Sequence, residues 1–171
     1  TEENVSSCKG YEGIVIQTRC IITEKVAALL AEAGVKFIAC RSAGFDHVNL
    51  AAIKKYGIKA CNVPLYSPNA IAEYAVMASM MALRKVKKQL HMTEKGDYTL
   101  KGLRGQELRD QTIGIIGTGR IGMESLKIFS SFTKDILLYD PYPREDAKAM
   151  GTYVSLDEIY EKSTLLVFHC P

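Results

Sequence analysis

The sequence of 171 residues lacks any long uninterrupted run of apolar residues. A membrane-spanning helix needs roughly 18 or more of them in succession, so we expect no membrane helix and no membrane partner. The first residues, Thr1 to Asn4, also lack the basic and apolar segments of a secretory signal peptide. These absences predict a cytoplasmic protein.

Cysteines at metal-binding spacing are missing as well. The chain has five cysteines, an odd number, and no C-x-x-C motif. A metal site would need clustered ligands at regular spacing, so no bound metal is expected. Cys40, Cys61 and Cys170 lie in or beside apolar runs, where a free thiol behaves as a small hydrophobic side chain. We therefore predict that all five are buried free thiols in a reducing compartment.

There is no excess of charge of either sign. The 22 basic and 19 acidic residues give a net charge of +3, which is too even to indicate a nucleic-acid-binding protein. The densest basic run, residues 84–88, is expected to be the solvated end of a helix, where positive charge suits the helix dipole. Apolar residues make up 47% of the chain, which argues against disorder.

Strand and helix patterns alternate along the chain. Apolar or β-branched runs of strand length occupy residues 13–16, 35–40, 58–63, 112–116, 136–139 and 165–168. Between them, helical patterns occupy residues 24–33, 46–56, 121–132 and 156–162, with Asp46 as the expected N-cap of the second. This alternation predicts an α/β fold in which parallel sheets are covered by helices.

The longest predicted helix begins after Ser67, a good N-cap residue, with Pro68 in its first position. It is expected to run from residue 70 to about residue 90, and apolar residues cover most of its circumference as far as Leu83. We therefore expect it to be buried on more than one side. Residues 96–110 form a polar, glycine-bearing connector, where we place the boundary between two structural units.

The clearest functional motif is the glycine-rich turn Gly117-Thr-Gly119-Arg-Ile-Gly122. It follows a predicted strand, opens a helix and precedes Asp140, which ends the next strand about twenty residues on. Gly117 would permit the tight turn, Gly119 the approach of a pyrophosphate, and Gly122 the close packing of helix on strand. The helix start would offer N–H groups to the phosphates. This context favours a dinucleotide site over a glycine turn without a ligand.

Asp140 bears on the choice of cofactor. A carboxylate there would accept hydrogen bonds from the adenosine ribose and repel a 2′-phosphate, which favours NAD over NADP. Arg144 lies four residues further on and leaves NADP open, and a solvent-facing strand end is the alternative for Asp140. The loop at Ser42, Ala43 and Gly44 could present N–H groups to a small anion, although a plain tight turn is the simpler interpretation.

Four segments together resemble the D-2-hydroxyacid dehydrogenases. They are residues 41–48 (RSAGFDHV), 62–73 (NVPLYSPNAIAE), 117–122 (GTGRIG) and 139–143 (YDPYP). The branch of D-lactate and D-2-hydroxyisocaproate dehydrogenases is the most similar, and the resemblance covers essentially the whole chain. It implies an α/β architecture with a flavodoxin-like part of a substrate domain, followed by the first half of a Rossmann NAD-binding domain.

The resemblance also implies a division of the chain and an activity. Residues 1–67 would belong to the substrate domain, 68–110 to an interdomain helix and dimerisation connector, and 111–171 to the NAD-binding domain. The parent protein would be a homodimer, formed through the helix after Pro68 and the 96–110 connector. It would reversibly reduce a small 2-keto acid such as pyruvate with NADH.

Individual residues receive roles from the same resemblance. The backbone of Ala43 and Gly44 would hold the substrate carboxylate, and Tyr66 would contribute to the substrate pocket. Contacts with NAD are implied for Gly117, Gly119, Arg120, Ile121, Gly122, Asp140, His169, Cys170 and Pro171. The family's catalytic arginine, glutamate and histidine correspond to positions beyond Pro171, so we expect no catalytic residue in this chain. His47 is expected to pack at a helix start and His91 to be solvated.

Two other interpretations stay open. One is a non-catalytic NAD-binding scaffold or remnant of the same family, and the other is a different nucleotide enzyme such as a methyltransferase. By itself the chain is expected to be inactive in hydride transfer. We also expect poor stability, because half of a doubly wound sheet exposes a strand edge and apolar surface.

Overall fold

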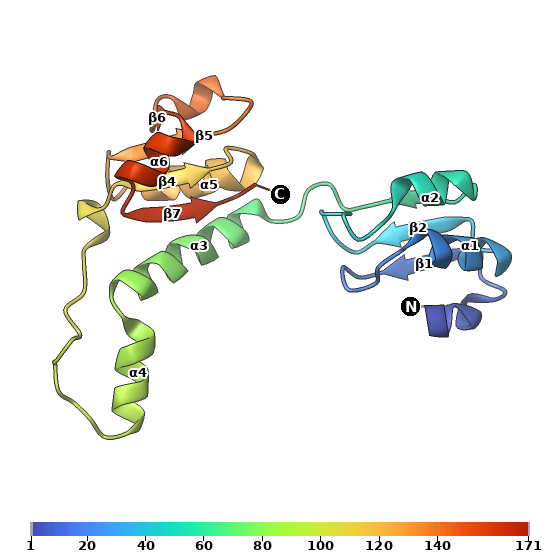
Figure 1. The fold of residues 1–171 in the computed structure, drawn as a ribbon, viewed down its shortest axis with the longest axis horizontal. Helices are drawn as coiled ribbons and strands as arrows, with labels where there is room; N and C mark the ends of the chain where they lie inside the picture. The colour runs from blue at the N-terminus through green and yellow to red at the C-terminus, as the bar shows by residue number, and fades with distance from the viewer. Residues whose placement is uncertain (1, 171) are drawn as a thin grey trace. The chain divides into compact units, whose positions relative to one another are not determined.

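The computed structural model describes residues 2–170. It divides into two compact units, Thr1–Tyr66 and Ser67–Pro171 (Figure 1), and each is a parallel α/β arrangement. The predicted boundary between units in residues 96–110 is therefore wrong, because the long helix after Ser67 and the connector both belong to the second unit. Among the described residues, no helix combines the length and the apolar character that a membrane span requires.

The first unit is built on a three-stranded parallel sheet in the order β1-β2-β3. Its elements are the 3-10 helix η1 (Glu2–Cys8), β1 (Gly13–Ile16), α1 (Glu24–Glu32), β2 (Phe37–Cys40), α2 (Leu50–Lys55) and β3 (Lys59–Cys61). The register pairs Ile14 with Ile38 and Ile38 with Ala60. The alternation of strands and helices that the sequence predicts is therefore confirmed here.

The core of the first unit lies on one side of this sheet. Ile16 and Ile38 point from the strands into a cluster that includes Val26 and Leu30 of α1. On the other face, Phe37 of β2 is 52% exposed, and Val15 of β1 is exposed as well. The alternation of side chains along a strand explains the difference, because only every second residue faces the helices.

Helix starts in the first unit follow capping chemistry. The hydroxyl of Thr23 accepts a hydrogen bond from the N–H of Val26, which starts α1 as the sequence predicts. The predicted start of α2 at Asp46 is wrong, because Asn49 caps the helix instead, by accepting from the N–H of Ala52. Val48 forms a parallel bridge with Ile22, which holds the preceding segment outside the helix.

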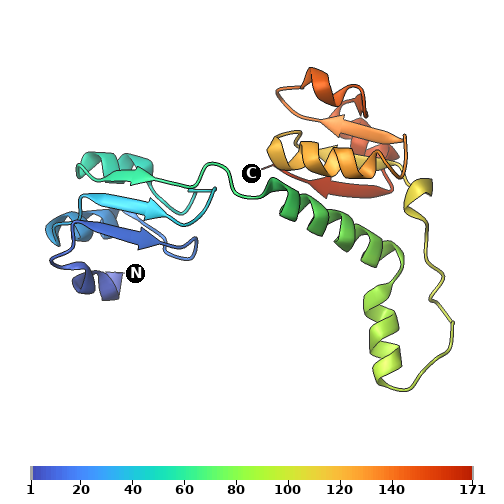
Figure 2. The ribbon, with the colours of Figure 1, turned by 180° about the vertical axis from the view of Figure 1, so that it is seen from behind.

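The second unit is a four-stranded parallel sheet in the order β6-β5-β4-β7. Its strands are β4 (Ile113–Ile116), β5 (Ile136–Tyr139), β6 (Thr152–Tyr153) and β7 (Leu165–Phe168), and its helices are α3 (Pro68–Leu83), α4 (Val86–Glu94), α5 (Arg120–Phe129) and α6 (Leu156–Lys162). The short 3-10 helices η2 (Leu108–Asp110) and η3 (Glu145–Ala147) lie in the connections. Figures 1 and 2 show α5 and α6 on opposite faces of the sheet.

Helix α3 packs against α5 through one face only. Ala72, Val76 and Ser79 are buried, whereas Tyr74 and Met77 are exposed. The expectation of burial on several sides is wrong for the described residues, because the outer apolar face of α3 has no partner among them. Ser67 also has a left-handed backbone (φ 36°) and makes no side-chain cap bond, contrary to its predicted role.

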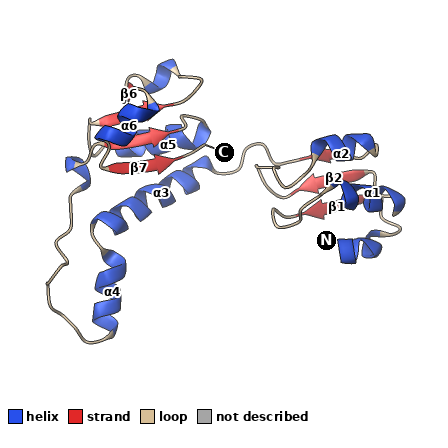
Figure 3. Cartoon of the chain, in the orientation of Figure 1, coloured by secondary structure: helices blue, strands red, loops and turns tan. Residues whose placement is uncertain are grey.

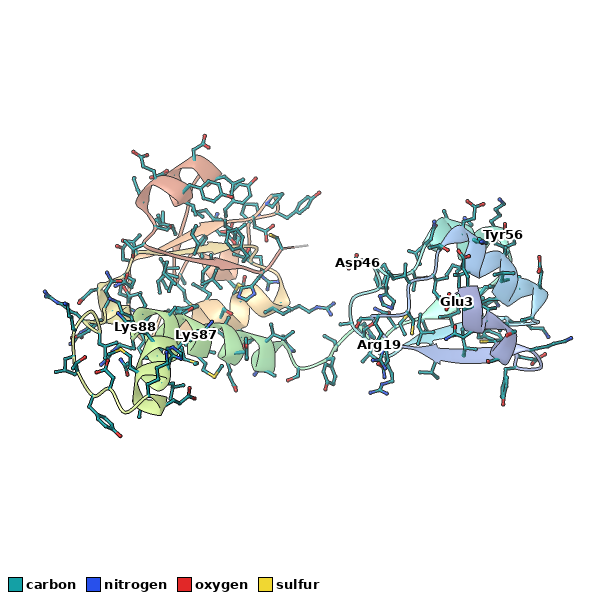
Figure 4. The ribbon with its side chains drawn as sticks, turned by 60° about the horizontal axis from the view of Figure 1, so that its bottom comes forward. Glu3, Arg19, Asp46, Tyr56, Lys87 and Lys88 are labelled. Carbon is teal, nitrogen blue, oxygen red and sulfur yellow. The ribbon has the colours of Figure 1, made fainter. Side chains whose placement is uncertain are left out.

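The predicted continuous helix to residue 90 is interrupted. Lys85 has φ 55°, in the left-handed region, and is the N-cap residue of α4. Figure 3 shows α3 and α4 as two separate helices. Lys87 and Lys88 are solvated, as predicted, but they lie at the start of α4 rather than at a helix end (Figure 4). A cation is disfavoured by the helix dipole there, so the dipole argument is wrong for these two lysines. It holds for Arg84, which is exposed and is the C-cap residue of α3.

The cysteines divide by their place in the sheets. Cys40 is buried on β2, and burial raises the pKa of its thiol, with a smaller contribution from Cys61. Cys8 and Cys20 are half-buried, while Cys61 and Cys170 are exposed, so the prediction of five buried thiols is wrong for these four. Cys61 ends the edge strand β3, where only one neighbouring strand covers it. The described residues contain no group of three or more potential metal ligands.

Candidate functional site

The turn between β4 and α5 contains the three motif glycines, each in a different environment. Gly117 has φ +96°, and a Cβ on it would lie 2.6 Å from the carbonyl oxygen of His169. A Cβ on Gly122 would lie 2.0 Å from the carbonyl oxygen of Gly117. Gly119, in contrast, has nothing within 4 Å of a Cβ position. Two glycines are therefore required by packing, and the third leaves open space beside the backbone.

That open space lies at the start of α5. Gly119 is the N-cap residue and provides no side-chain cap bond to the first turn, which begins with Arg120 and Ile121. Helix N-termini attract anions, because their first N–H groups lack acceptors within the helix and the dipole is positive there. The sequence thus places a bare backbone turn where a phosphate group would fit.

Asp140 follows β5, the strand that pairs with β4. Its Oδ2 accepts from the N–H of Thr118 (2.6 Å) and from the Thr118 hydroxyl (3.2 Å), and its Oδ1 accepts from the N–H of Tyr142 (2.8 Å). Burial raises the pKa of Asp140, but these hydrogen bonds outweigh it and hold the pKa below its ordinary value. The residue is therefore an ionised acceptor held directly beside the glycine-rich turn.

Sequence reasoning missed two residues that hold this arrangement together. Thr118 is fully buried, and its hydroxyl lies 2.7 Å from the hydroxyl of Tyr153 on β6. The Tyr153 hydroxyl also accepts from the N–H of Arg144 (3.0 Å). Strand β6 has only two residues, too few for an apolar pattern to reveal it. The threonine inside the glycine motif carried no signal either, because its partners come from distant segments.

The end of β7 lies against the same turn. The N–H of His169 donates to the carbonyl of Ile116 (2.8 Å), and its Nε2 lies 2.7 Å from the buried hydroxyl of Ser125 on α5. Burial lowers the pKa of the His169 imidazole, so the ring is neutral at pH 7. Cys170 is exposed next to it, and the predicted contact at Pro171 lies outside the described residues.

A second candidate site lies in the first unit, after β2. Asn62 donates from Nδ2 to the carbonyl of Ala43 (2.7 Å), and the hydroxyl of Ser42 donates to the carbonyl of Gly44 (2.6 Å). The N–H of Val63 donates to the carbonyl of Ser42 (3.0 Å). Ala43 and Gly44 are both exposed in this loop, and their backbone amides are candidate donors for an anion.

The surroundings of this loop are charged. Arg19 and Asp46 lie in the loops after β1 and β2, respectively (Figure 4), and a carboxylate oxygen of Asp46 lies 3.6 Å from the Cβ position of Gly44. Tyr66 is 74% exposed at the end of this unit.

The other two histidines differ in their surroundings. His47 is half-buried before α2, and its Nε2 is buried with no hydrogen-bond partner among the described residues. His91 is exposed on α4, as predicted.

Comparison with known proteins relates the whole chain to one family. The family described as D-isomer specific 2-hydroxyacid dehydrogenase, catalytic domain, matches residues 1–164. A D-2-hydroxyacid dehydrogenase (NAD(+)) of Clostridioides difficile is 41% identical, over 100% of this chain and 52% of that protein. An aromatic 2-oxoacid reductase of Clostridium sporogenes is 38% identical, over 95% of this chain and 50% of that protein.

Solved structures agree. The apo-structure of D-lactate dehydrogenase from Escherichia coli superposes with a TM-score of 0.87 at 35% identity, and the match covers 100% of this chain and 54% of that one. The chain therefore spans about half the length of the relatives that it matches.

Proposed function

The chain belongs to the D-isomer specific 2-hydroxyacid dehydrogenase family, and from this premise we propose that the protein containing it is an NAD-dependent D-2-hydroxyacid dehydrogenase. Its reaction is the reversible reduction of a small 2-keto acid such as pyruvate. The observation that carries the proposal is the ionised Asp140, held 2.6 Å from the backbone of the glycine-rich turn. A strand-end acid beside such a turn is the arrangement that binds the ribose and pyrophosphate of NAD.

The residues present fit this cofactor. The open space at Gly119, which makes no side-chain cap bond at the start of α5, suits a pyrophosphate. Asp140 accepts two hydrogen bonds at Oδ2 and one at Oδ1, so the remaining acceptor position on Oδ1 suits a ribose hydroxyl. In this assignment residues 111–171 are the first half of a Rossmann domain, with Arg120 and Ile121 at the pyrophosphate. His169 and Cys170 line the adenine side. Bound as NADH, the cofactor would supply the hydride for the reduction, and bound as NAD it would accept hydride in the reverse direction, while the chain supplies its binding and orientation.

The first unit has the complementary role in this proposal. Residues 1–67 belong to the substrate domain, where the amides of Ala43 and Gly44 bind the carboxylate common to all 2-keto acids. Their carbonyls are fixed by Asn62 and Ser42, so the donors do not need to reorganise when the anion binds. Tyr66 contributes to the pocket for the rest of the substrate. A loop that is already ordered in this way does not lose affinity to the cost of becoming ordered when the substrate binds.

We further propose that the protein is a homodimer through α3, α4 and the 96–110 connector. Support comes from exposed apolar side chains along this segment, namely Ile71, Tyr74, Met77, Met81, Leu90, Tyr98 and Leu100. A concentration of exposed large apolar side chains on one segment is typical of an interface. Tyr74→Asp together with Met77→Asp should convert the dimer to monomer in size-exclusion chromatography with light scattering. Glu73→Gln, on the same helix, serves as a control that adds no charge to the apolar face.

The activity is tested on the whole protein as its gene encodes it. NADH oxidation is followed by absorbance with pyruvate and a panel of longer and aromatic 2-keto acids, and the products are analysed for the D-configuration. Turnover of at least one 2-keto acid is expected. NAD binding without turnover of any of them would instead identify a non-catalytic scaffold. Absence of both binding and turnover would remove the dehydrogenase proposal altogether.

A further inference from the structure

The segment that follows Asp140 contains a basic residue whose backbone is linked to Asp140 through Tyr153 and Thr118. Arg144 is exposed and lies in the connection between β5 and β6. A guanidinium in such a position is the usual partner of the 2′-phosphate that distinguishes NADP from NAD. Its present partners therefore bear on which dinucleotide the site accepts.

The guanidinium of Arg144 is already engaged. Its Nε donates to Oδ1 of Asp146 (2.9 Å), and its Nη2 donates to Oδ2 of the same carboxylate (2.7 Å). This two-point geometry is the strongest form of an arginine–carboxylate pair. The hydrogen bond from Arg144 lowers the pKa of Asp146, so the pair is ionised at neutral pH.

The backbone of Arg144 is linked to Asp140 by a chain of hydrogen bonds. Arg144 donates from its N–H to the Tyr153 hydroxyl, and Tyr153 bonds to the hydroxyl of Thr118, which also contacts Asp140. A carboxylate and a backbone N–H each allow only one direction of donation. The bonds therefore run from Arg144 to Tyr153, from Tyr153 to Thr118, and from Thr118 to Asp140. A guanidinium released from Asp146 would start from a backbone anchored through this network to Asp140.

We propose that Asp146 is a specificity-determining residue, which keeps the guanidinium of Arg144 from serving a 2′-phosphate and thereby favours NAD. The inference rests on the proposed NAD site and adds a second determinant to Asp140. Because the pair is solvent-exposed, its contribution is a few-fold rather than several orders of magnitude. In this proposal, Asp140 repels a 2′-phosphate, and Asp146 keeps the Arg144 guanidinium from neutralising that phosphate.

The neighbouring pair provides a matched control. Glu145 precedes Asp146 in the short helix η3 and forms an ion pair with Lys148 (2.5 Å), and both pairs are solvent-exposed. Glu145→Gln and Asp146→Asn each remove one negative charge from the same loop. Only the second releases Arg144, so a difference between them separates a specific effect from a general change of charge.

The experiment measures dissociation constants by calorimetry on the whole protein, with NAD, NADP, 5′-AMP and adenosine 2′,5′-bisphosphate as the ligands. Asp146→Asn should shift the affinity ratio toward the 2′-phosphorylated ligand by about three- to tenfold. Glu145→Gln should shift it by less than about twofold, since it leaves Arg144 paired. The double variant Asp146→Asn with Arg144→Ala should lose the gain.

Two results would overturn the inference while leaving NAD binding established. One is an equal shift in Glu145→Gln and Asp146→Asn, and the other is a gain that survives Arg144→Ala. If the unsubstituted protein binds none of the four ligands, the proposed function fails, and the inference fails with it. Thermal melts of each variant verify that the loop substitutions leave the fold intact.

Discussion

An alanine at residue 119 would place a methyl group in the open space beside the backbone of the glycine-rich turn. Gly119 has φ −65° and ψ −164°, a conformation that alanine adopts without strain, and nothing lies within 4 Å of the new Cβ. Stability should therefore stay equal or rise by about 0.4–1 kcal/mol, as for other compatible glycine-to-alanine changes. Nucleotide affinity should fall at least about tenfold, or about 1.4 kcal/mol, because the methyl group occupies the path of the pyrophosphate.

Gly122→Ala is the matched comparison. Its Cβ would lie 2.0 Å from the carbonyl oxygen of Gly117, so the helix or the turn must move. Overpacking of this kind costs roughly 1–3 kcal/mol. Thermal melts and calorimetric titration with NAD on the whole protein separate the two effects. Normal NAD affinity in Gly119→Ala, or a loss of stability equal to that of Gly122→Ala, would refute the assignment of a ligand to this space.

Three further predictions concern stability and binding. Burial lowers the pKa of His169 below its ordinary value of 6.5, so the unfolded state takes up a proton first as the pH falls. The unfolding free energy should therefore decrease as the pH falls from 6.5 to the pKa of the folded state. Denaturant titrations at about pH 7.5 and about pH 5.5 should show a smaller difference for His169→Gln than for the unsubstituted protein. Lys85→Gly should raise the unfolding free energy by about 1 kcal/mol, because glycine adopts the left-handed backbone of residue 85 without strain. Lys87→Gly, within α4, should lower the unfolding free energy by about 0.5–1 kcal/mol, because glycine is a poor helix former. Equal losses for the two variants in urea titrations would contradict this. Tyr153→Phe removes the hydroxyl that links Thr118 to the backbone of residue 144. The unfolding free energy should fall by about 0.5–1.5 kcal/mol in urea titrations, and NAD should bind more weakly in calorimetry. Unchanged values would argue against the hydrogen-bond chain.

Much of the fold follows from local patterns. The strands at 113–116, 136–139 and 165–168 are apolar enough to be recognised, and the helices at 24–32 and 156–162 have clear capping residues. The late start of α2 depends on the bridge between Ile22 and Val48, a contact between segments that are far apart in sequence. The break at Lys85 occurs without proline or glycine at that residue, so composition gave no sign of it.

The candidate site divides in the same way. The glycine spacing and the strand-end acid are local signals, and the structure brings Asp140 to the backbone of Thr118. Tyr153, Arg144 and Asp146 were not recognised as a network, because their contacts depend on the path of the chain between β5 and β6. That path is set by the burial of Ala147 and by the two-residue strand β6, and spacing encodes neither.

Because the core of the first unit lies on one side of its sheet, substitutions along strand β2 can report whether the opposite face is buried in the whole protein. In this chain Ile38 and Cys40 face the helices, whereas Phe37 faces outward and is half exposed. A mutational scan of the isolated chain should therefore alternate, with polar residues tolerated at 37 and rejected at 38. The same scan in the whole protein reports which positions lose that tolerance. Each position that does so would mark a contact made on this face of the sheet.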